Sequence, residues 1–236
     1  MHAIHLRGPA AALCLVWLAV PATAAPLISE VFYDATGSDN GLSFVELWGA
    51  PGTSLDGLTL EGVNGTNGAI TPSVSLSGVI GAGGLFVVAD DDGTGTTLVP
   101  GADLILNFDF QNGPDSVLLR DAGGVLDALG YGSFGVGEVF AGEGSPAPDA
   151  PADSALARVF ANADTDDNLA DFVVLAPTPG TAPLAPIPEP GTLALVTAGL
   201  AALTGVSRAR ADRSRPRARQ RQAAGLPCGQ GGYAAR

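Results

Sequence analysis

The sequence predicts an all-β protein, built as a sandwich or a barrel. Apolar runs of strand length recur along the chain with turn-forming residues between them, and no long helical period separates them. The predicted strands cover residues 27–33, 43–48, 57–63, 84–89, 104–110, 115–120, 125–131, 155–160 and 171–175. We therefore expect roughly seven to nine strands in two sheets, with little helix.

The residues between these runs support the prediction. Asn64-Gly65, Asn67-Gly68 and Asn112-Gly113 are dipeptides that supply the positive backbone angles of tight hairpin turns. A hairpin is also predicted around residues 121–124, between two of the strands. Residues 176–190 are rich in proline, alanine and threonine, and this composition predicts an extended stalk outside the core.

The amino end has the three parts of a secretory signal peptide over residues 1–24. A short basic start precedes an apolar run over 11–20, and small residues stand at Ala22 and Ala24, where signal peptidase requires them. The run is too short to span a bilayer, which favours cleavage over anchoring. We expect the rest of the chain to be exported.

Charge is distributed unevenly along the chain, whose formal net charge is −13. Lysine is absent, and between residues 25 and 186 the basic residues are Arg120 and Arg158 alone. All acidic residues except Glu189 and Asp212 lie in that same segment. An acidic surface repels phosphate, so nucleic acid is not expected as a partner. The charge serves solubility or collects divalent cations.

The exported segment has few groups that can carry chemistry. Residues 25–186 contain no histidine, cysteine or lysine, which removes the usual bases, thiol nucleophiles and imine-forming amines. Carboxylates alone can still hydrolyse glycosides. Glu30 and Glu46, both in predicted strands, are the first pair to consider for that role, whereas exposed strand glutamates are the ordinary interpretation.

One acidic turn has the alternation of oxygen ligands that calcium loops use. Asp164, Asp166 and Asn168 stand at alternate positions, and Asp171 follows near enough to assist. The helix-loop-helix calcium pattern is incomplete here, because Asp167 occupies its glycine position. Two interpretations stay open: a calcium site, or side chains that cap their own turns. No other cofactor is expected.

The order of motifs across residues 26–183 resembles that of a lamin tail domain. The motifs are LISEVFY at 27–33, FVEL at 44–47, LDGLTL at 55–60, GAGGLFVV at 81–88, GPDSVLL at 113–119, VLDALGYG at 125–132, DTDDNLADF at 164–172 and PTPG at 177–180. The resemblance implies an immunoglobulin-like β-sandwich and a non-catalytic adhesion or interaction module. Trp48-Gly49 departs from the family, which often has a polar residue after FVEL.

The carboxyl end resembles the PEP-CTERM sorting signal of Gram-negative bacteria. Pro188, Glu189 and Pro190 precede an apolar stretch over 192–207, and arginines follow at once, beginning with Arg208, Arg210 and Arg213. As a helix, the uninterrupted run is about 22 Å long, short for a hydrocarbon core of about 30 Å. The resemblance implies transient anchoring in the inner membrane and processing by an exosortase-type membrane protease.

The sequence thus divides into a signal peptide at 1–24, a domain at 26–183, a linker at 184–191, a membrane helix at 192–207 and a basic cytoplasmic tail at 208–236. We expect a non-enzymatic protein of the cell surface or extracellular matrix, which binds exopolysaccharide or surface proteins. The alternative is a calcium-dependent carbohydrate-binding or hydrolytic protein of the biofilm matrix.

Overall fold

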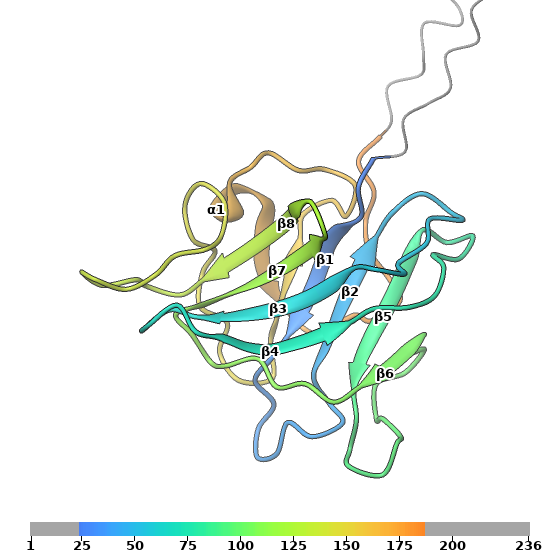
Figure 1. Cartoon of the computed structure of the whole chain (residues 1–236), viewed down its shortest axis with the longest axis horizontal. Helices are drawn as coiled ribbons and strands as arrows, with labels where there is room; N and C mark the ends of the chain where they lie inside the picture. Colours follow the sequence, from blue (N-terminus) through green and yellow to red (C-terminus); the bar gives the residue numbers. More distant parts are fainter. Residues whose placement is uncertain (1–23, 187–236) are drawn as a thin grey trace, which may run out of the picture. The chain divides into compact units, whose positions relative to one another are not determined.

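The computed structural model describes residues 24–186, and these form two β-sheets with one short helix (Figure 1). The all-β prediction is therefore confirmed. Described residues up to Ala185 belong to one compact unit. The predicted signal peptide, the helix at 192–207 and the basic tail lie outside the described residues. Within residues 24–186, no helix is long and apolar enough to cross a membrane.

The larger sheet has six strands, and its central strands come from the start of the domain. In spatial order they are β10 (Phe172–Leu175), β9 (Ala155–Arg158), β1 (Leu27–Phe32), β2 (Phe44–Trp48), β5 (Leu85–Asp90) and β6 (Leu104–Leu106). Neighbours are antiparallel except β5 and β6, which run parallel. The four-residue helix α1 (Asn168–Asp171) directly precedes the edge strand β10.

The smaller sheet is a four-stranded antiparallel sheet. Its spatial order is β4 (Ile70–Ser75), β3 (Thr59–Asn64), β7 (Asp115–Asp121) and β8 (Gly124–Tyr131). The hairpin predicted between the last two strands is present. A carboxylate oxygen of Asp121 accepts hydrogen bonds from the backbone N–H groups of Gly123 and Gly124, which closes the turn.

The described residues contain ten strands rather than the predicted seven to nine. The missed strand is β4, whose residues are mostly exposed. It has no continuous apolar run, and Pro72 at its centre disfavours a strand. Another prediction was too long, because β6 ends at Leu106 instead of residue 110. Beyond it, Phe108 and Phe110 are buried in the main core, and the Phe108 N–H donates to an Asp90 carboxylate instead of a neighbouring strand.

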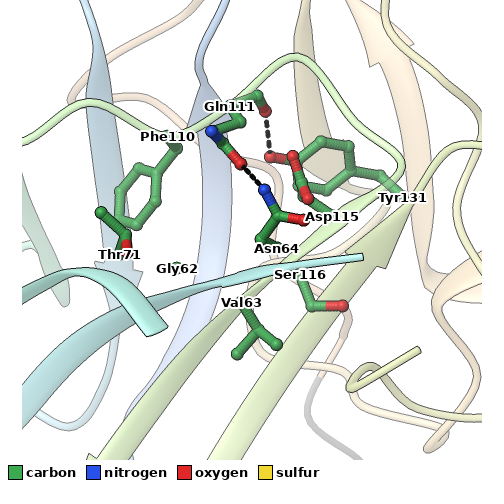
Figure 2. A pocket seen from close by; sticks show the side chains of 9 residues that line it. All are labelled: Gly62, Val63, Asn64, Thr71, Phe110, Gln111, Asp115, Ser116 and Tyr131. Atoms are coloured by element: carbon green, nitrogen blue, oxygen red, sulfur yellow. Dashed lines mark hydrogen bonds between the residues drawn. The ribbon is translucent and has the colours of Figure 1, made fainter. Parts of the chain in front are cut away.

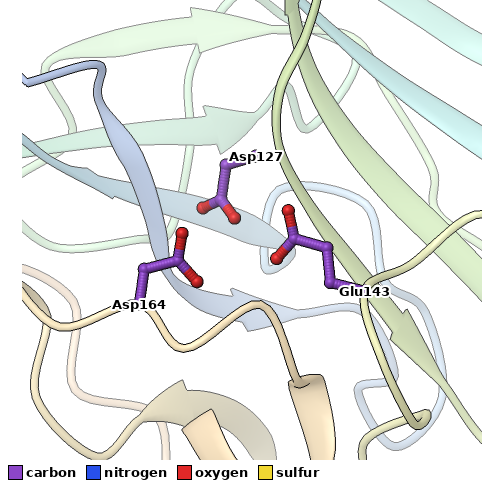
Figure 3. A group of neighbouring side chains, drawn as sticks. All are labelled: Asp127, Glu143 and Asp164. Carbon is purple, nitrogen blue, oxygen red and sulfur yellow. The ribbon is translucent and has the colours of Figure 1, made fainter.

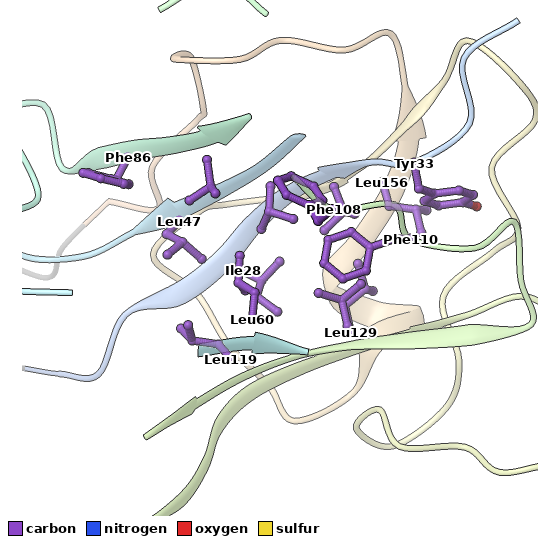
Figure 4. Close-up of a cluster of buried hydrophobic side chains, with 14 of the residues drawn as sticks. Ile28, Tyr33, Leu47, Leu60, Phe86, Phe108, Phe110, Leu119, Leu129 and Leu156 are labelled. Atoms are coloured by element: carbon purple, nitrogen blue, oxygen red, sulfur yellow. The ribbon is translucent and has the colours of Figure 1, made fainter. Parts of the chain in front are cut away.

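The core lies between the two sheets, where the apolar faces of their strands meet (Figure 4). The six-stranded sheet contributes Ile28, Leu47 and Phe86, and the other sheet contributes Leu60 and Leu129, all of them buried. Because alternate residues of a strand face opposite sides, one face of each sheet supplies this core. The arrangement is a β-sandwich.

The outer face of the six-stranded sheet is also covered, which the sequence did not lead us to expect. We name residues 177–185 the strap. Its backbone and side chains bond to β1, to β2 and to the turn after β9, where the Ala161 N–H donates to the Pro183 carbonyl at 2.9 Å. The prediction of an extended stalk over 176–190 is therefore wrong for the strap, because buried carboxylates on the sheet give its backbone donors partners.

Candidate functional site

Glu30 of β1 and Glu46 of β2 lie directly opposite each other across the two central strands. Both are buried, with relative exposures of 1% and 0%. A β-bulge between Ile28 and Glu30 interrupts the alternation, and the Ser29 hydroxyl also reaches Glu46. The strands were predicted to hold both glutamates, and the structure brings the two together.

The strap supplies most of the donors to this pair. Thr178 donates its backbone N–H to Glu30 Oε1 and its hydroxyl to Oε2, both at 2.8 Å. Glu46 accepts from the Ser29 hydroxyl at 2.8 Å and from the Gly180 N–H at 2.7 Å. Each of the four carboxylate oxygens therefore has a hydrogen-bond donor.

The PTPG sequence of the strap explains this fit. Proline has no backbone N–H, so within residues 177–180 only Thr178 and Gly180 can donate from the backbone. Residues 178–181 form a β-turn in which the Thr181 N–H donates to the Thr178 carbonyl at 3.0 Å, and the N–H groups of Thr178 and Gly180 bond to the sheet. Gly180 has φ +82°, a backbone angle that glycine adopts without strain.

Burial without a cation makes these carboxyls hard to ionise. Loss of water raises the pKa of Glu30 to about 7, and the negative charge of Glu46 contributes to the rise. The pKa of Glu46 is also raised, chiefly by burial. The basic residues of the described segment are engaged elsewhere, Arg120 with Glu61 and Arg158 with acids on the far side of β9. The pair has hydrogen-bond donors but no positive partner.

Two cavities flank the strap on this face. One, of about 200 Å³, is lined by Glu30, by Ala157 and Arg158 of β9, by the edge strand β10, and by strap residues 178 and 181–183. The other, of about 220 Å³, is lined by apolar and proline side chains, among them Phe44, Pro177 and Pro179. Only the first of these two cavities is lined by a carboxylate.

A second polar centre lies inside the sandwich, around the guanidinium of Arg158 on β9. Arg158 donates to both carboxylate oxygens of Asp127 on β8, to Asp171 at 2.8 Å and to Asp164 at 3.2 Å. Its guanidinium also stacks 4.6 Å from the ring centre of Phe172. This network joins the two sheets, and its density of bonds indicates a structural role.

The predicted calcium ligands do not all point to one place. Asp164 Oδ1 accepts from Arg158 and from the Asp166 N–H. The side-chain oxygen of Asn168 accepts from the N–H groups of Gly130 and Glu143, which uses both of its lone pairs. Asn168 is therefore a buried brace between the acidic turn and β8, an arrangement that favours the capping interpretation.

The structure groups Asp164 instead with Asp127 and Glu143 (Figure 3). One oxygen from each of the three carboxyls lies within 4.8 Å of the others. Glu143 Oε2 is buried without a hydrogen-bond partner, and burial together with the neighbouring acids raises the Glu143 pKa to about 7. These oxygens could hold a cation, but Arg158 already supplies a positive charge to Asp127 and Asp164.

A further hollow lies between β3 and the segment that precedes β7 (Figure 2). The side chains of Asn64 and Gln111 are hydrogen-bonded there, and the Tyr131 hydroxyl donates to the Gln111 carbonyl at 2.7 Å. The hollow has no room for a water-sized molecule. It is a closed junction rather than a binding site.

Several predicted site residues fall outside residues 24–186. They are the sorting motif Pro188, Glu189 and Pro190 and the membrane-flanking Arg208, Arg210 and Arg213. Sequence reasoning in turn missed Thr178 and Arg158 as site-forming residues. Arg158 was detectable in principle, because a single arginine interrupts an apolar run in an acidic domain.

Comparisons with protein-family models, with curated proteins and with solved structures found no match to this chain.

Proposed function

We propose that the chain is an exported, non-enzymatic protein of the cell surface or extracellular matrix of a Gram-negative bacterium. Its β-sandwich would be immunoglobulin-like, of the lamin tail type, and would act as an adhesion or interaction module. Supporting this are the motif order over residues 26–183 and the two-sheet architecture. Its partners would be exopolysaccharide or surface proteins.

The main support for a non-enzymatic function is that the carboxyl groups of Glu30 and Glu46 are covered and hydrogen-bonded. A glycosidase needs two carboxyl groups that flank the substrate, one as acid and one as base or nucleophile. Here the strap covers the pair, each oxygen accepts a hydrogen bond, and only Glu30 lines a cavity. A hydrolase would need both carboxyls to reach one substrate, so the arrangement favours binding over hydrolysis.

The binding proposal is tested by capture from the matrix of the producing organism. The mature protein, immobilised through its amino end, should retain a defined matrix component in the presence of a chelator. A hydrolytic protein would instead release soluble sugar from purified exopolysaccharide, and this release would disappear in Glu30→Gln. Such release would overturn the non-enzymatic proposal.

The sorting proposal concerns the carboxyl end. We propose that signal peptidase removes residues 1–24 and that an exosortase-type protease cleaves near Pro188-Glu189-Pro190. Mass spectrometry of surface protein from the native host should then lack peptides from 193–208. Glu189→Ala should retain the protein in the inner membrane. Stoichiometric recovery of the 193–208 peptides would mean a permanent anchor.

A further inference from the structure

The cavity under the strap joins a buried carboxylate to apolar walls. Glu30 lies at this cavity with 1% of its surface exposed, while Val173 and Leu175 on β10 are 41% and 38% exposed. Val159, which follows β9, and Pro183 complete an apolar rim. An acidic end with an aliphatic wall matches a ligand that carries a positive charge on a hydrocarbon chain.

We propose that this cavity binds a linear alkylammonium group, with the ammonium at Glu30 and the methylenes along Val173 and Leu175. The ligand is either a free aliphatic amine or a lysine side chain of a partner protein. This inference deepens the binding function proposed above and rests on it.

Charge complementarity is the first argument. Glu30 and Glu46 place two carboxyls on one buried face. Arg158 also lines the cavity, but its guanidinium is paired with three aspartates, and no salt bridge within residues 24–186 reaches either glutamate. Lysine is absent from the whole chain, so no second copy can supply that side chain. A cation entering from outside would meet an acid that burial has deprived of water, which strengthens the attraction.

Hydrogen-bonding capacity is the second argument. Each Glu30 oxygen accepts one bond from Thr178 and keeps a free lone pair, since a carboxylate has about four acceptor sites. Thr178 and Thr181 line the same cavity, and a threonine hydroxyl can also accept a hydrogen bond. An ammonium group has three donors, and these acceptors can satisfy them.

Size is the third argument. The cavity volume of about 200 Å³ is many times the roughly 10–15 Å³ that one water-sized group needs. A lysine side chain or a five-carbon amine fits this volume. The neighbouring cavity beside Pro177 and Pro179 is similar in volume but is lined by no acid, so it provides an internal comparison.

The test is titration of the full chain with n-pentylammonium chloride, followed by calorimetry and by amide chemical shifts. We expect saturable binding with shifts centred on Thr178, Val173 and Thr181, and no matching response to 1-pentanol. Glu30→Gln should weaken the affinity at least about tenfold, the loss expected for a buried charge pair. Its amide can still accept from the Thr178 N–H and donate to the hydroxyl, so the strap should stay in place.

Two variants guard against a trivial loss of folding. Glu138→Gln removes a negative charge from a residue that does not line the cavity and should change the affinity less than about threefold. Val173→Lys places an ammonium at the cavity from an exposed strand position; it should raise the melting temperature and abolish binding of the amine. Equal binding of pentylammonium by wild type and Glu30→Gln, or equal binding of the alcohol, would overturn the proposal.

The source of the ammonium is then resolved with a second pair of probes. If a capped Gly-Lys-Gly peptide binds more tightly than pentylammonium, a lysine of a partner is the ligand; the reverse order assigns a free amine. A norleucine peptide, which lacks the charge, should not bind. If none of the ammonium probes binds, the proposal of a binding site in this cavity is refuted. That result would not bear on the proposed export to the cell surface or on binding to the matrix, which the mass spectrometry and the capture experiment test separately.

Discussion

Arg158 of β9 and Asp127 of β8 form an ion pair at 3.0 Å in which neither side chain has any exposed surface. The two residues belong to different sheets, so the pair crosses the interior of the sandwich. Asp127 also accepts from the Ile28 N–H, and Arg158 donates to the Ile28 carbonyl, which ties β1 to the same centre. Buried charges of this kind are tolerated only when they are paired.

Arg158→Met should therefore be strongly destabilising. It leaves Asp127 and Asp171 buried without their cation, a change that typically costs about 3–5 kcal/mol. Arg120→Met is the matched control, because Arg120 pairs with Glu61 nearer the surface, where such pairs contribute about 0–1 kcal/mol. Urea unfolding of the full chain measures both. Equal losses for the two variants would contradict the structural role of Arg158.

Stability should fall as the pH rises from about 5 to about 8. The folded-state pKa values of Glu30 and Glu143 are about 7, above their ordinary value of 4.5. A raised pKa means that the folded state keeps protons that the unfolded state releases, so the stabilisation is complete below pH 4.5 and lost through pH 7. Each 1 kcal/mol lost should lower the melting temperature by about 2–4 °C.

Glu30→Gln should flatten part of this pH dependence, because the amide does not titrate. Scanning calorimetry at several pH values measures the slope, and Glu138→Gln is a control in an exposed turn. A slope unchanged by Glu30→Gln would mean that Glu143 or other acids account for it.

The strap should be required for the stability of the domain. A chain that ends after Ala185 keeps the donors of Thr178 and Gly180, whereas one that ends after Ala176 leaves Glu30 and Glu46 without them. Each lost bond to a charged acceptor costs about 1.5–3 kcal/mol. We expect the shorter chain to unfold at markedly lower urea. If the two chains unfold at the same urea concentration, the strap does not stabilise the domain, and residues 177–185 would behave as the stalk that the sequence predicted.

Calcium should leave the melting curve unchanged. The Asn168 oxygen has no free lone pair, and Asp164 already faces Arg158. An ion that binds only the folded state would raise the melting temperature with concentration. A rise in millimolar calcium that disappears in Asp166→Asn would support the loop site; a rise that disappears in Glu143→Gln would indicate the site with Asp127 instead.

The sequence alone determined the fold class, because strand-length apolar runs and turn residues are local signals. The β7–β8 hairpin was predictable from the residues around Asp121 for that reason. The mostly exposed strand β4 was not, since it has no continuous apolar run and Pro72 at its centre disfavours a strand. The pairing of Glu30 with Glu46 could not be predicted either, because it depends on the register of two strands separated by a loop.

The roles of the buried glutamates, the acidic turn and the strap became clear only from the tertiary structure. Residues 177–180 are locally compatible with a stalk, and they cover the sheet because two buried carboxylates distant in sequence accept their donors. Likewise, the acidic turn resembles a calcium loop in isolation, yet Arg158 and β8 use several of its oxygens. Hydrogen bonds between segments far apart in the sequence determine which carboxylate oxygens remain available to bind a ligand. The local sequence does not show which distant segments will come into contact.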